Sequence, residues 1–284
     1  MSSFMSKQKT PKTPKTQKTQ KTQKRRKRRK PRSRRRATKV PQGPKIVDPI
    51  FSKMIHRGTA ASTCAIDYHY QSYETFASFL KIYVTQHPKI ASYVYMPKDF
   101  SDMMVELNLS SGSVKPVYIS EQTMTSYLKE GLRNPTIQLI PVILNLKIPK
   151  NPNHANVMVI DKDSHTIELF EPHGARTSAS TLGGHVGAYN KKLRHLRSYC
   201  KDLLPDYTVV NTVDEVKRTA FQTEKDPVGH SGYCVTWSLL YTQYRILNPK
   251  VPYYEIIQHI DSKITTRLLL RYARYVEETL KGSA

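Results

Sequence analysis

Apolar residues recur at helical spacing in two segments of the first half of the chain. In the first segment they stand three or four positions apart, at Phe76, Phe79, Leu80, Tyr83 and Val84. This spacing puts them on one face of a helix, so a helix is predicted over Ser72–His87. A second helix is predicted over Ser120–Leu132, ended by Gly131 and Pro135.

The pattern then changes from helical spacing to runs of Ile, Leu and Val. Thr136–Ile148 predicts a buried strand, and Ala155–Ile160 predicts a second strand. Asp161–Ser164 has the composition of a turn, so Thr166–Phe170 is predicted to pair back on the second strand as a hairpin. Tyr207–Val210 predicts a further short strand.

Helical patterns return in the second half of the chain, over residues 184–203, Gly232–Leu247 and Ile264–Leu280. The middle helix is ended by Asn248-Pro249, and we expect one of its faces to enter the core through Trp237, Leu240, Tyr241 and Tyr244. The sum is an α+β fold with a central mixed sheet flanked by helices, predicted as one domain over residues 46–284.

The positive charge of the chain is concentrated before this domain. The formal net charge is +24, yet residues 1–45 hold 19 Lys or Arg and no acid, so the remaining 239 residues carry a net of only +5. Residues 1–45 have almost no apolar side chains to offset the roughly 1–2 kcal/mol per residue that ordering a backbone costs. We therefore predict a disordered polybasic tail over residues 1–45.

The tail has the composition of a polyanion-binding segment. Five Lys-Thr-Pro or Lys-Thr-Gln triplets occupy residues 9–23, and Lys24–Arg36 holds eleven bases in thirteen residues. Such a segment binds nucleic acid by releasing counterions, in a salt-dependent manner and without reading sequence. The same cluster has the composition of a nuclear-import signal.

Other classes of protein are disfavoured by composition. No run of 18 apolar residues is present, so no membrane span is expected, and the basic start is not followed by a secretory apolar region. The three cysteines, Cys64, Cys200 and Cys234, are odd in number and form no C-x-x-C pair. We therefore expect a reducing compartment, no disulfide framework, no metal site and no cofactor. The sequence leaves the oligomeric state open.

Three residues of the domain form a candidate catalytic group. His154 stands just before the second strand, and a hairpin that returns after a short turn brings Glu171 back beside it. A carboxylate there would hold the imidazole in one tautomer and stabilise its charged form. Cys234 stands at the start of a helix, where the macrodipole favours a thiolate, and an imidazole partner would make it a nucleophile.

These residues carry a resemblance to a known family. The stretch HANVMVIDKDSHTIELFE resembles the His-strand-turn-strand-acid hairpin of the SUMO-specific cysteine proteases and the adenovirus protease, in which a Gln and then a Cys at a helix start follow. Uncharacterised proteins of large cytoplasmic DNA viruses contain motifs similar in wording to three motifs of this chain, H-A-N-V-x-V-I-D, I-E-L-F-E-P-H-G and G-Y-C-V-T-W-S. The resemblance covers roughly residues 136–250.

The resemblance implies a papain-like cysteine protease fold and a set of roles. His154 is implied as the general base, Glu171 as its orienting acid, Cys234 as the nucleophile and Gln222 as the oxyanion donor. The implied substrates are polypeptides, either viral polyprotein or ubiquitin-like conjugates. The implied location is a virion or an infected cell, at the nucleus or a cytoplasmic replication site, without secretion.

The sequence also departs from the family pattern, which keeps a second hypothesis open. Ala155 stands where the family has Trp, Tyr233-Cys234-Val235 replaces Asp-Cys-Gly, and Gln222 lies twelve residues before Cys234, farther than in the family. His154 also fits a polar residue at a strand start, Glu171 a strand-end carboxylate and Cys234 an inert core thiol. The alternative is a non-catalytic, nucleic-acid-binding virion protein on a degenerate peptidase scaffold.

Overall fold

A computed structural model describes most of the predicted domain. The described residues are 45–49, 72–97, 104–108, 114–116, 121–147, 154–172, 198, 201–202, 204–212, 221 and 233–282. The predicted tail therefore lies outside them, apart from its last residue, as do Gln222, Cys64 and Cys200. Most of the helix predicted over residues 184–203 lies outside them as well.

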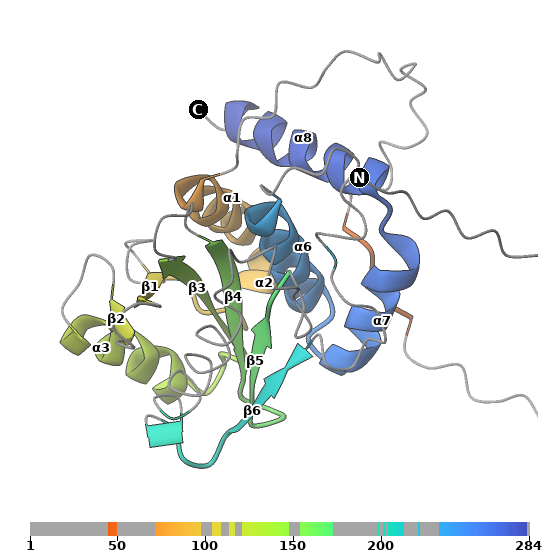
Figure 1. The fold of residues 1–284 in the computed structure, drawn as a ribbon. Helices are drawn as coiled ribbons and strands as arrows, with labels where there is room; N and C mark the ends of the chain where they lie inside the picture. The colour runs from red at the N-terminus through yellow and green to blue at the C-terminus, as the bar shows by residue number, and fades with distance from the viewer. Residues whose placement is uncertain are drawn as a thin grey trace, which may run out of the picture. The chain divides into compact units, whose positions relative to one another are not determined.

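Among these described residues, the framework is one six-stranded sheet with the strand order β2-β1-β3-β4-β5-β6 (Figure 1). Its strands are β1 (Met104–Asn108), β2 (Val114–Pro116), β3 (Leu139–Lys147), β4 (His154–Asp161), β5 (Thr166–Phe170) and β6 (Thr208–Asn211). β1 pairs with β3 and β5 with β6 in parallel, and the other neighbours are antiparallel. The sheet is mixed and lies among helices, which confirms the predicted α+β class.

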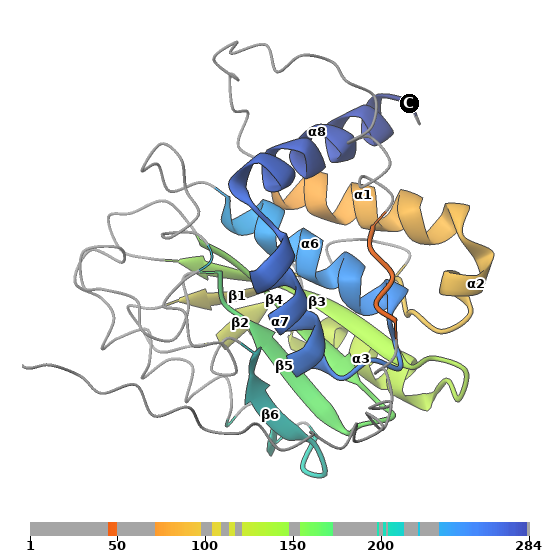
Figure 2. The same cartoon turned by 90° about the vertical axis from the view of Figure 1, so that its right-hand side faces the viewer.

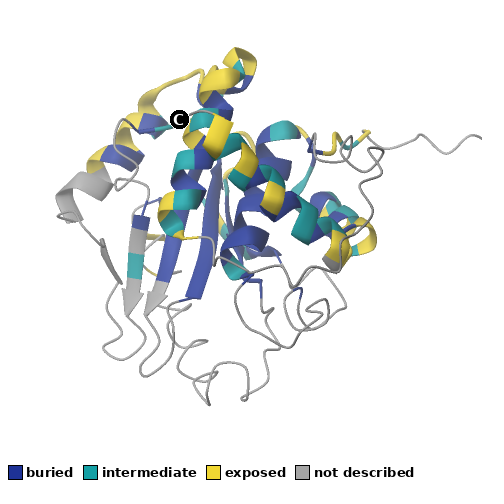
Figure 3. Cartoon of the chain, turned by 90° about the horizontal axis from the view of Figure 1, so that it is seen from above, coloured by how far each residue is buried: buried dark blue, intermediate teal, exposed yellow. Residues whose placement is uncertain are grey.

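The middle of the sheet is formed by β3, β4 and β5, whose register places Ile143 opposite Val157 and Val157 opposite Phe170. Every residue of β4 is buried, as expected for a central strand that is covered on both faces. Figure 3 shows the central strands coloured as buried. His154, which was predicted just before this strand, is its first residue.

The helices are α1 (Tyr73–Gln86), α2 (Pro88–Ala91), α3 (Glu121–Arg133), α6 (Cys234–Leu247), α7 (Tyr253–Lys263) and α8 (Thr266–Gly282). α1 begins where the Ser72 hydroxyl accepts a hydrogen bond from the Thr75 N–H, 3.1 Å away, which is an ordinary N-cap. α6 ends at Leu247 with Asn248 as its C-cap, immediately before Pro249, as predicted.

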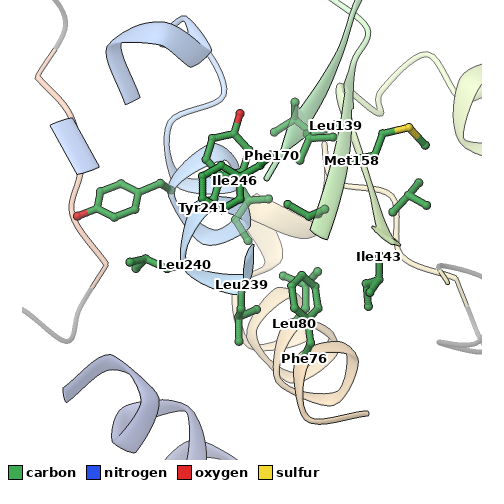
Figure 4. Close-up of a cluster of buried hydrophobic side chains, with 14 of the residues drawn as sticks. Phe76, Leu80, Leu139, Ile143, Met158, Phe170, Leu239, Leu240, Tyr241 and Ile246 are labelled. Atoms are coloured by element: carbon green, nitrogen blue, oxygen red, sulfur yellow. The ribbon is translucent and has the colours of Figure 1, made fainter. Parts of the chain in front are cut away.

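The helices cover the two faces of the sheet. α1, α6 and α8 lie together on one face (Figure 2), and α7 packs against α6. Leu139 and Ile143 of β3 point toward α1 and α6 (Figure 4). Ile140 points to the opposite face because side chains alternate along a strand, and α3 approaches that face through Gly131. The sheet therefore lies between two helical layers.

Gly131 corrects one prediction. It was expected to end its helix, but α3 continues through it to Arg133. A Cβ at Gly131 would lie 2.8 Å from Ile140 Cδ1 and 3.0 Å from a ring carbon of Tyr95. The absence of a side chain therefore serves the close approach of α3 to the sheet, and the helix ends two residues before Pro135.

The core is shared between the sheet and the inner helices. Phe76 and Leu80 of α1 meet Leu239 of α6 (Figure 4), and the Phe170 and Tyr241 rings stack with centroids 4.6 Å apart. α6 was expected to bury one face, but every residue from Val235 to Ile246 is buried. This helix lies inside the molecule, because the sheet covers one side of it and α1, α7 and α8 pack against it elsewhere.

Four of the elements that the structure describes were not predicted, namely α2, α7, β1 and β2. β1 and β2 have mixed composition and too few residues to show a period. No helix within the described ranges has both the length and the apolar character that crossing a membrane requires.

A buried ionic cluster joins α6 to the β4–β5 hairpin. The Arg245 guanidinium donates two hydrogen bonds to Glu168, at 2.7 and 2.8 Å, and one to Asp161, at 3.0 Å. It also donates to the Val251 carbonyl at 2.8 Å, and the Tyr241 hydroxyl donates to Glu168 at 2.6 Å. Arg245 and Glu168 have no exposed surface, so their charges are compensated inside the protein by each other, by Asp161 and by hydrogen bonds rather than by solvent.

Arg245→Met is expected to lower the free energy of unfolding by about 3–5 kcal/mol, because it leaves Glu168 and Asp161 buried without their cation. Urea unfolding followed by Trp237 fluorescence measures the change. Arg274→Met, at an exposed position of α8, is the matched control and should stay within about 0.5 kcal/mol of the parent. Equal small effects for the two variants would contradict a structural role for the cluster.

Candidate active site

His154 and Glu171 meet at one end of the β4–β5 hairpin. His154 is the first residue of β4, and Glu171 directly follows β5, whose last registered pair is Phe170 with Val157. The hairpin thus returns Glu171 to the start of β4. His154 Nε2 lies 2.6 Å from Glu171 Oε1, and the two residues are only 4% and 2% exposed. This is the juxtaposition that the spacing of the sequence predicted.

Asn156 completes the surroundings of the carboxylate. Its Nδ2 donates a hydrogen bond of 2.6 Å to Glu171 Oε2, so both carboxylate oxygens are held. Sequence reasoning missed Asn156. The available signal was a polar side chain two positions after His154, on the same face of a strand that is otherwise apolar.

Cys234 is brought to the same place by α6, of which it is the first residue. Its thiol is hydrogen-bonded to the His154 imidazole and to the backbone of Ala155, the next residue of β4. Because Nε2 of His154 is held by Glu171, Nδ1 is the ring nitrogen left for the thiol. Cys234 is partly exposed, whereas His154 and Glu171 are buried. The structure therefore brings His154, Glu171 and Cys234 together in one chain of contacts.

The helix start adds positive potential at the sulfur. Tyr233 is the N-cap and makes no side-chain capping bond, and the Trp237 N–H donates to its carbonyl at 2.8 Å. The N–H groups of Cys234 and Val235 precede this first intrahelical bond and point past the helix start. The positive end of the macrodipole therefore lies at the thiol.

His154 and Cys234 each stabilise the charged form of the other. Burial lowers the pKa of His154, but the carboxylate of Glu171 and the sulfur of Cys234 outweigh it and raise that pKa to about 10. Burial raises the pKa of the Cys234 thiol, but the charge and hydrogen bond of His154 and the backbone of Ala155 outweigh it, so that pKa is lowered. Both shifts therefore favour a thiolate beside an imidazolium.

A hydrogen bond from Ser238 also fixes the position of α6 relative to β4. The hydroxyl of Ser238, which is fully buried, donates to the Ala155 carbonyl at 3.3 Å. Ser238 stands four residues after Cys234 and so lies on the same face of the helix. The Ala155 backbone thus contacts α6 through both the thiol and the hydroxyl.

Gln222, the fourth predicted site residue, lies outside the described residues. Its neighbour Phe221 is buried between Phe170 and Trp237, with ring centroids 5.7 and 5.2 Å away. The role of Gln222 as an oxyanion donor stays a prediction of the sequence.

The arrangement provides the parts of thiol-based acyl transfer. It has a nucleophile with a lowered pKa, a base and acid in contact with it, and a carboxylate that orients the base. Across the described ranges, no group of three or more His, Cys, Asp and Glu residues is placed to hold a metal ion.

Comparisons with known proteins give low similarity. No protein-family model and no curated protein matches the chain. Among solved structures, the chain is similar to the yeast C-terminal Ulp1 protease domain in complex with the SUMO ortholog Smt3, with 11% identity, 74% of this chain and 75% of that chain covered, and a TM-score of 0.41.

Two similar structures come from Chlamydia trachomatis. ChlaDub1 has 11% identity over 75% of this chain and 94% of its own, with a TM-score of 0.42. The effector Cdu1 bound to ubiquitin has 11% identity over the same shares, with a TM-score of 0.39. At TM-scores below 0.5 these likenesses add nothing to what the geometry of the site supports.

Alkylation of Cys234 by iodoacetamide at about pH 7 is expected to be faster than that of an ordinary cysteine, because a lowered pKa keeps more thiolate present below the ordinary cysteine value of about 8.5. Removing the imidazolium in His154→Ala should slow the reaction at that pH by at least about tenfold. Peptide mapping by mass spectrometry assigns the alkylation, and Cys234→Ser is the control. An alkylation midpoint near pH 8.5 that His154→Ala leaves unchanged would contradict the ion pair.

Proposed function

We propose that the protein is a cysteine peptidase or isopeptidase. The observation that carries this proposal is the chain of contacts from the Cys234 thiol through His154 to Glu171, with the 2.6 Å bond between the imidazole and the carboxylate. A cysteine that only fills space in a core needs neither a charged partner nor a position at a helix start. The Cys234 sulfur has the His154 imidazole as its partner and also lies at the start of α6.

The reaction would proceed in two halves. The Cys234 thiolate attacks the carbonyl carbon, a C–S bond forms, and the carbonyl π electrons move to the oxygen. When the C–N bond breaks, the His154 imidazolium gives its proton to the leaving amine, and a thioester remains. Water then attacks the thioester carbonyl and His154 takes one of its protons. The C–S bond breaks, the carboxylic acid leaves, and the Cys234 thiolate is restored beside the His154 imidazolium.

Glu171 and the helix start have supporting roles in this scheme. Glu171, held by Asn156, stabilises the imidazolium and fixes the plane of the ring. The N–H groups of the first turn of α6 lie where negative charge would develop on the carbonyl oxygen. On the motif resemblance, Gln222 would add a further donor.

The proposed substrate is a ubiquitin-like conjugate, with viral polyprotein as the other member of the class. The support is the order of His, acid and Cys in the sequence and the motif wording around them. A location in a virion or an infected cell has the same support and stays a prediction.

The basic tail is proposed as a tether to nucleic acid, on the strength of its 19 bases and its lack of acids. The chain directly after it is fixed to the domain. Val47 N–H donates to Asn248 Oδ1 at 2.6 Å, and Asp48 Oδ1 accepts from Tyr244 at 2.9 Å and contacts His259 at 2.7 Å. These contacts lie at the end of α6, about 20 Å along the helix from Cys234. Deleting residues 1–45 therefore leaves the contacts of Val47 and Asp48 with the domain in place.

Ubiquitin and SUMO probes that carry a C-terminal propargylamide are expected to label the protein at Cys234. Labelling should vanish in Cys234→Ala and fall at least about tenfold in His154→Ala, because the thiol then loses its activating base. Cys64→Ala and Cys200→Ala are the matched controls and should label as the parent does. Labelling that persists in Cys234→Ala would contradict the proposal, and no labelling by either probe would favour the non-catalytic alternative.

Deleting residues 1–45 is expected to abolish salt-sensitive retention on DNA and to leave probe labelling unchanged. Log affinity of the full chain should fall with log salt concentration, with a slope of about −0.9 for each phosphate neutralised. Fluorescence anisotropy with duplexes of two unrelated sequences measures both the slope and the lack of sequence preference. Retention that survives the deletion with the same slope would remove the tail from the proposal.

A further inference from the structure

A polar pair formed by a partly buried tyrosine and a buried asparagine lies on the side of β4 opposite the hairpin. Tyr73 is the first residue of α1, and Asn145 lies in β3. The Tyr73 hydroxyl donates a hydrogen bond of 2.7 Å to Asn145 Oδ1, and Asn145 is 5% exposed. Neither residue has a part in the reaction scheme given above.

The register of the sheet puts Asn145 beside the nucleophile. Asn145 is the direct antiparallel partner of Ala155, so the two Cα atoms lie about 4.5–5.5 Å apart. Directly opposed residues present their side chains on the same face of the sheet. Ala155 is the residue whose backbone is hydrogen-bonded to the Cys234 thiol. Asn145 therefore lies on β3, the strand next to the residue that the Cys234 sulfur contacts.

The bond from Tyr73 sets the direction of the amide. A hydroxyl that donates to Oδ1 fixes that end of the side chain, so Nδ2 and its two hydrogens lie on the other side. Within the described part of the chain, no residue accepts a hydrogen bond from Asn145 Nδ2. The amide donor is therefore available for an acceptor, and the carbonyl oxygen of a bound substrate would supply one.

The Tyr73 hydroxyl keeps its proton under the conditions of the reaction. Burial raises its pKa far above the ordinary value, and the negative charges of Cys234, Glu106 and Glu74 raise it further. Glu106 is the partner of Asn145 on the β1 side, so the polar row continues across the sheet. Tyr73 therefore stays a donor, and Asn145 keeps one orientation.

We propose that Asn145, oriented by Tyr73, donates a hydrogen bond from Nδ2 to the carbonyl oxygen of the substrate as Cys234 attacks. This inference rests on the proposed function. The tetrahedral oxygen would lie between the first turn of α6 and β3, with backbone donors on one side and the amide on the other. Each hydrogen bond strengthens as the carbonyl π electrons move onto the oxygen, and weakens again when the C–N bond breaks.

The proposal separates acyl transfer from thiol reactivity. Hydrolysis passes through an oxyanion, whereas alkylation by iodoacetamide needs only the thiolate. A residue that acts on the oxyanion affects the first reaction alone. A residue that merely supports Cys234 or His154 affects both.

The test measures p-nitrophenyl acetate hydrolysis, cleavage of a ubiquitin-like fluorogenic conjugate and alkylation of Cys234 in the full chain. Asn145→Ala should lower kcat about 10²–10³-fold with little change in KM, and leave the alkylation rate and its pH profile as in the parent. Tyr73→Phe should lower kcat less, because the donor is kept and only its orientation is lost. Tyr127→Phe, which removes a hydroxyl bond to the Pro141 carbonyl elsewhere on β3, is the matched control and should hydrolyse as the parent does.

The double variant Tyr73→Phe with Asn145→Leu guards against loss of the fold, because replacing both partners by apolar groups of similar size is close to neutral. It should fold, alkylate normally and show the same loss of kcat as Asn145→Ala. Unchanged kcat in these variants, or an equal loss of hydrolysis and alkylation, would overturn the inference alone. A parent chain that hydrolyses neither substrate would overturn the proposed function, and the inference with it.

Discussion

The attachment of α6 to the β4–β5 hairpin is the constraint on which the rest of the structure depends. Arg245 makes it, through its bonds to Glu168 and Asp161 inside the protein. An ion cluster without solvent tolerates little sliding, because any shift leaves a charge uncompensated. Hydrophobic burial supplies most of the stability of such a core, but it is not directional. The hydrogen bonds of the Arg245 guanidinium are directional, so they fix how α6 lies against the hairpin.

The attachment at Arg245 also determines where the other end of α6, with Cys234, is placed. Cys234 stands eleven residues before Arg245, about 16 Å along the axis, and Ser238 fixes the helix to Ala155 between them. His154 and Glu171 belong to the hairpin that Arg245 holds. The thiol and the imidazole are therefore placed by two rigid elements joined at separate points. Such placement is what an activated nucleophile needs, since catalytic geometry tolerates about 0.5 Å of error.

The sequence predicted the parts of the fold that have a strong period or a clear boundary. The hairpin from β4 to β5, the ends of α6 and the return of Glu171 to His154 follow from local patterns, because strand length and turn position determine which residues meet. β1 and β2 show no period, and α6 is buried on all sides through contacts with helices far away in the chain. Asn156, Asn145 and Tyr73 were missed because their importance comes from strand register and from the start of a distant helix. The polar positions in buried strands were visible, but their partners were not.

The thiolate–imidazolium pair is the central claim, and the protonation state of His154 tests it most directly. Nuclear magnetic resonance of ¹³C-labelled histidine follows the His154 ring through a pH titration, with His154→Gln to assign the signal. The account predicts an imidazolium that persists through pH 8 and titrates with a pKa of about 10, and a lower pKa in Cys234→Ala, where the sulfur is removed. A His154 signal that titrates at or below the ordinary value of about 6.5, unchanged by Cys234→Ala, would contradict it.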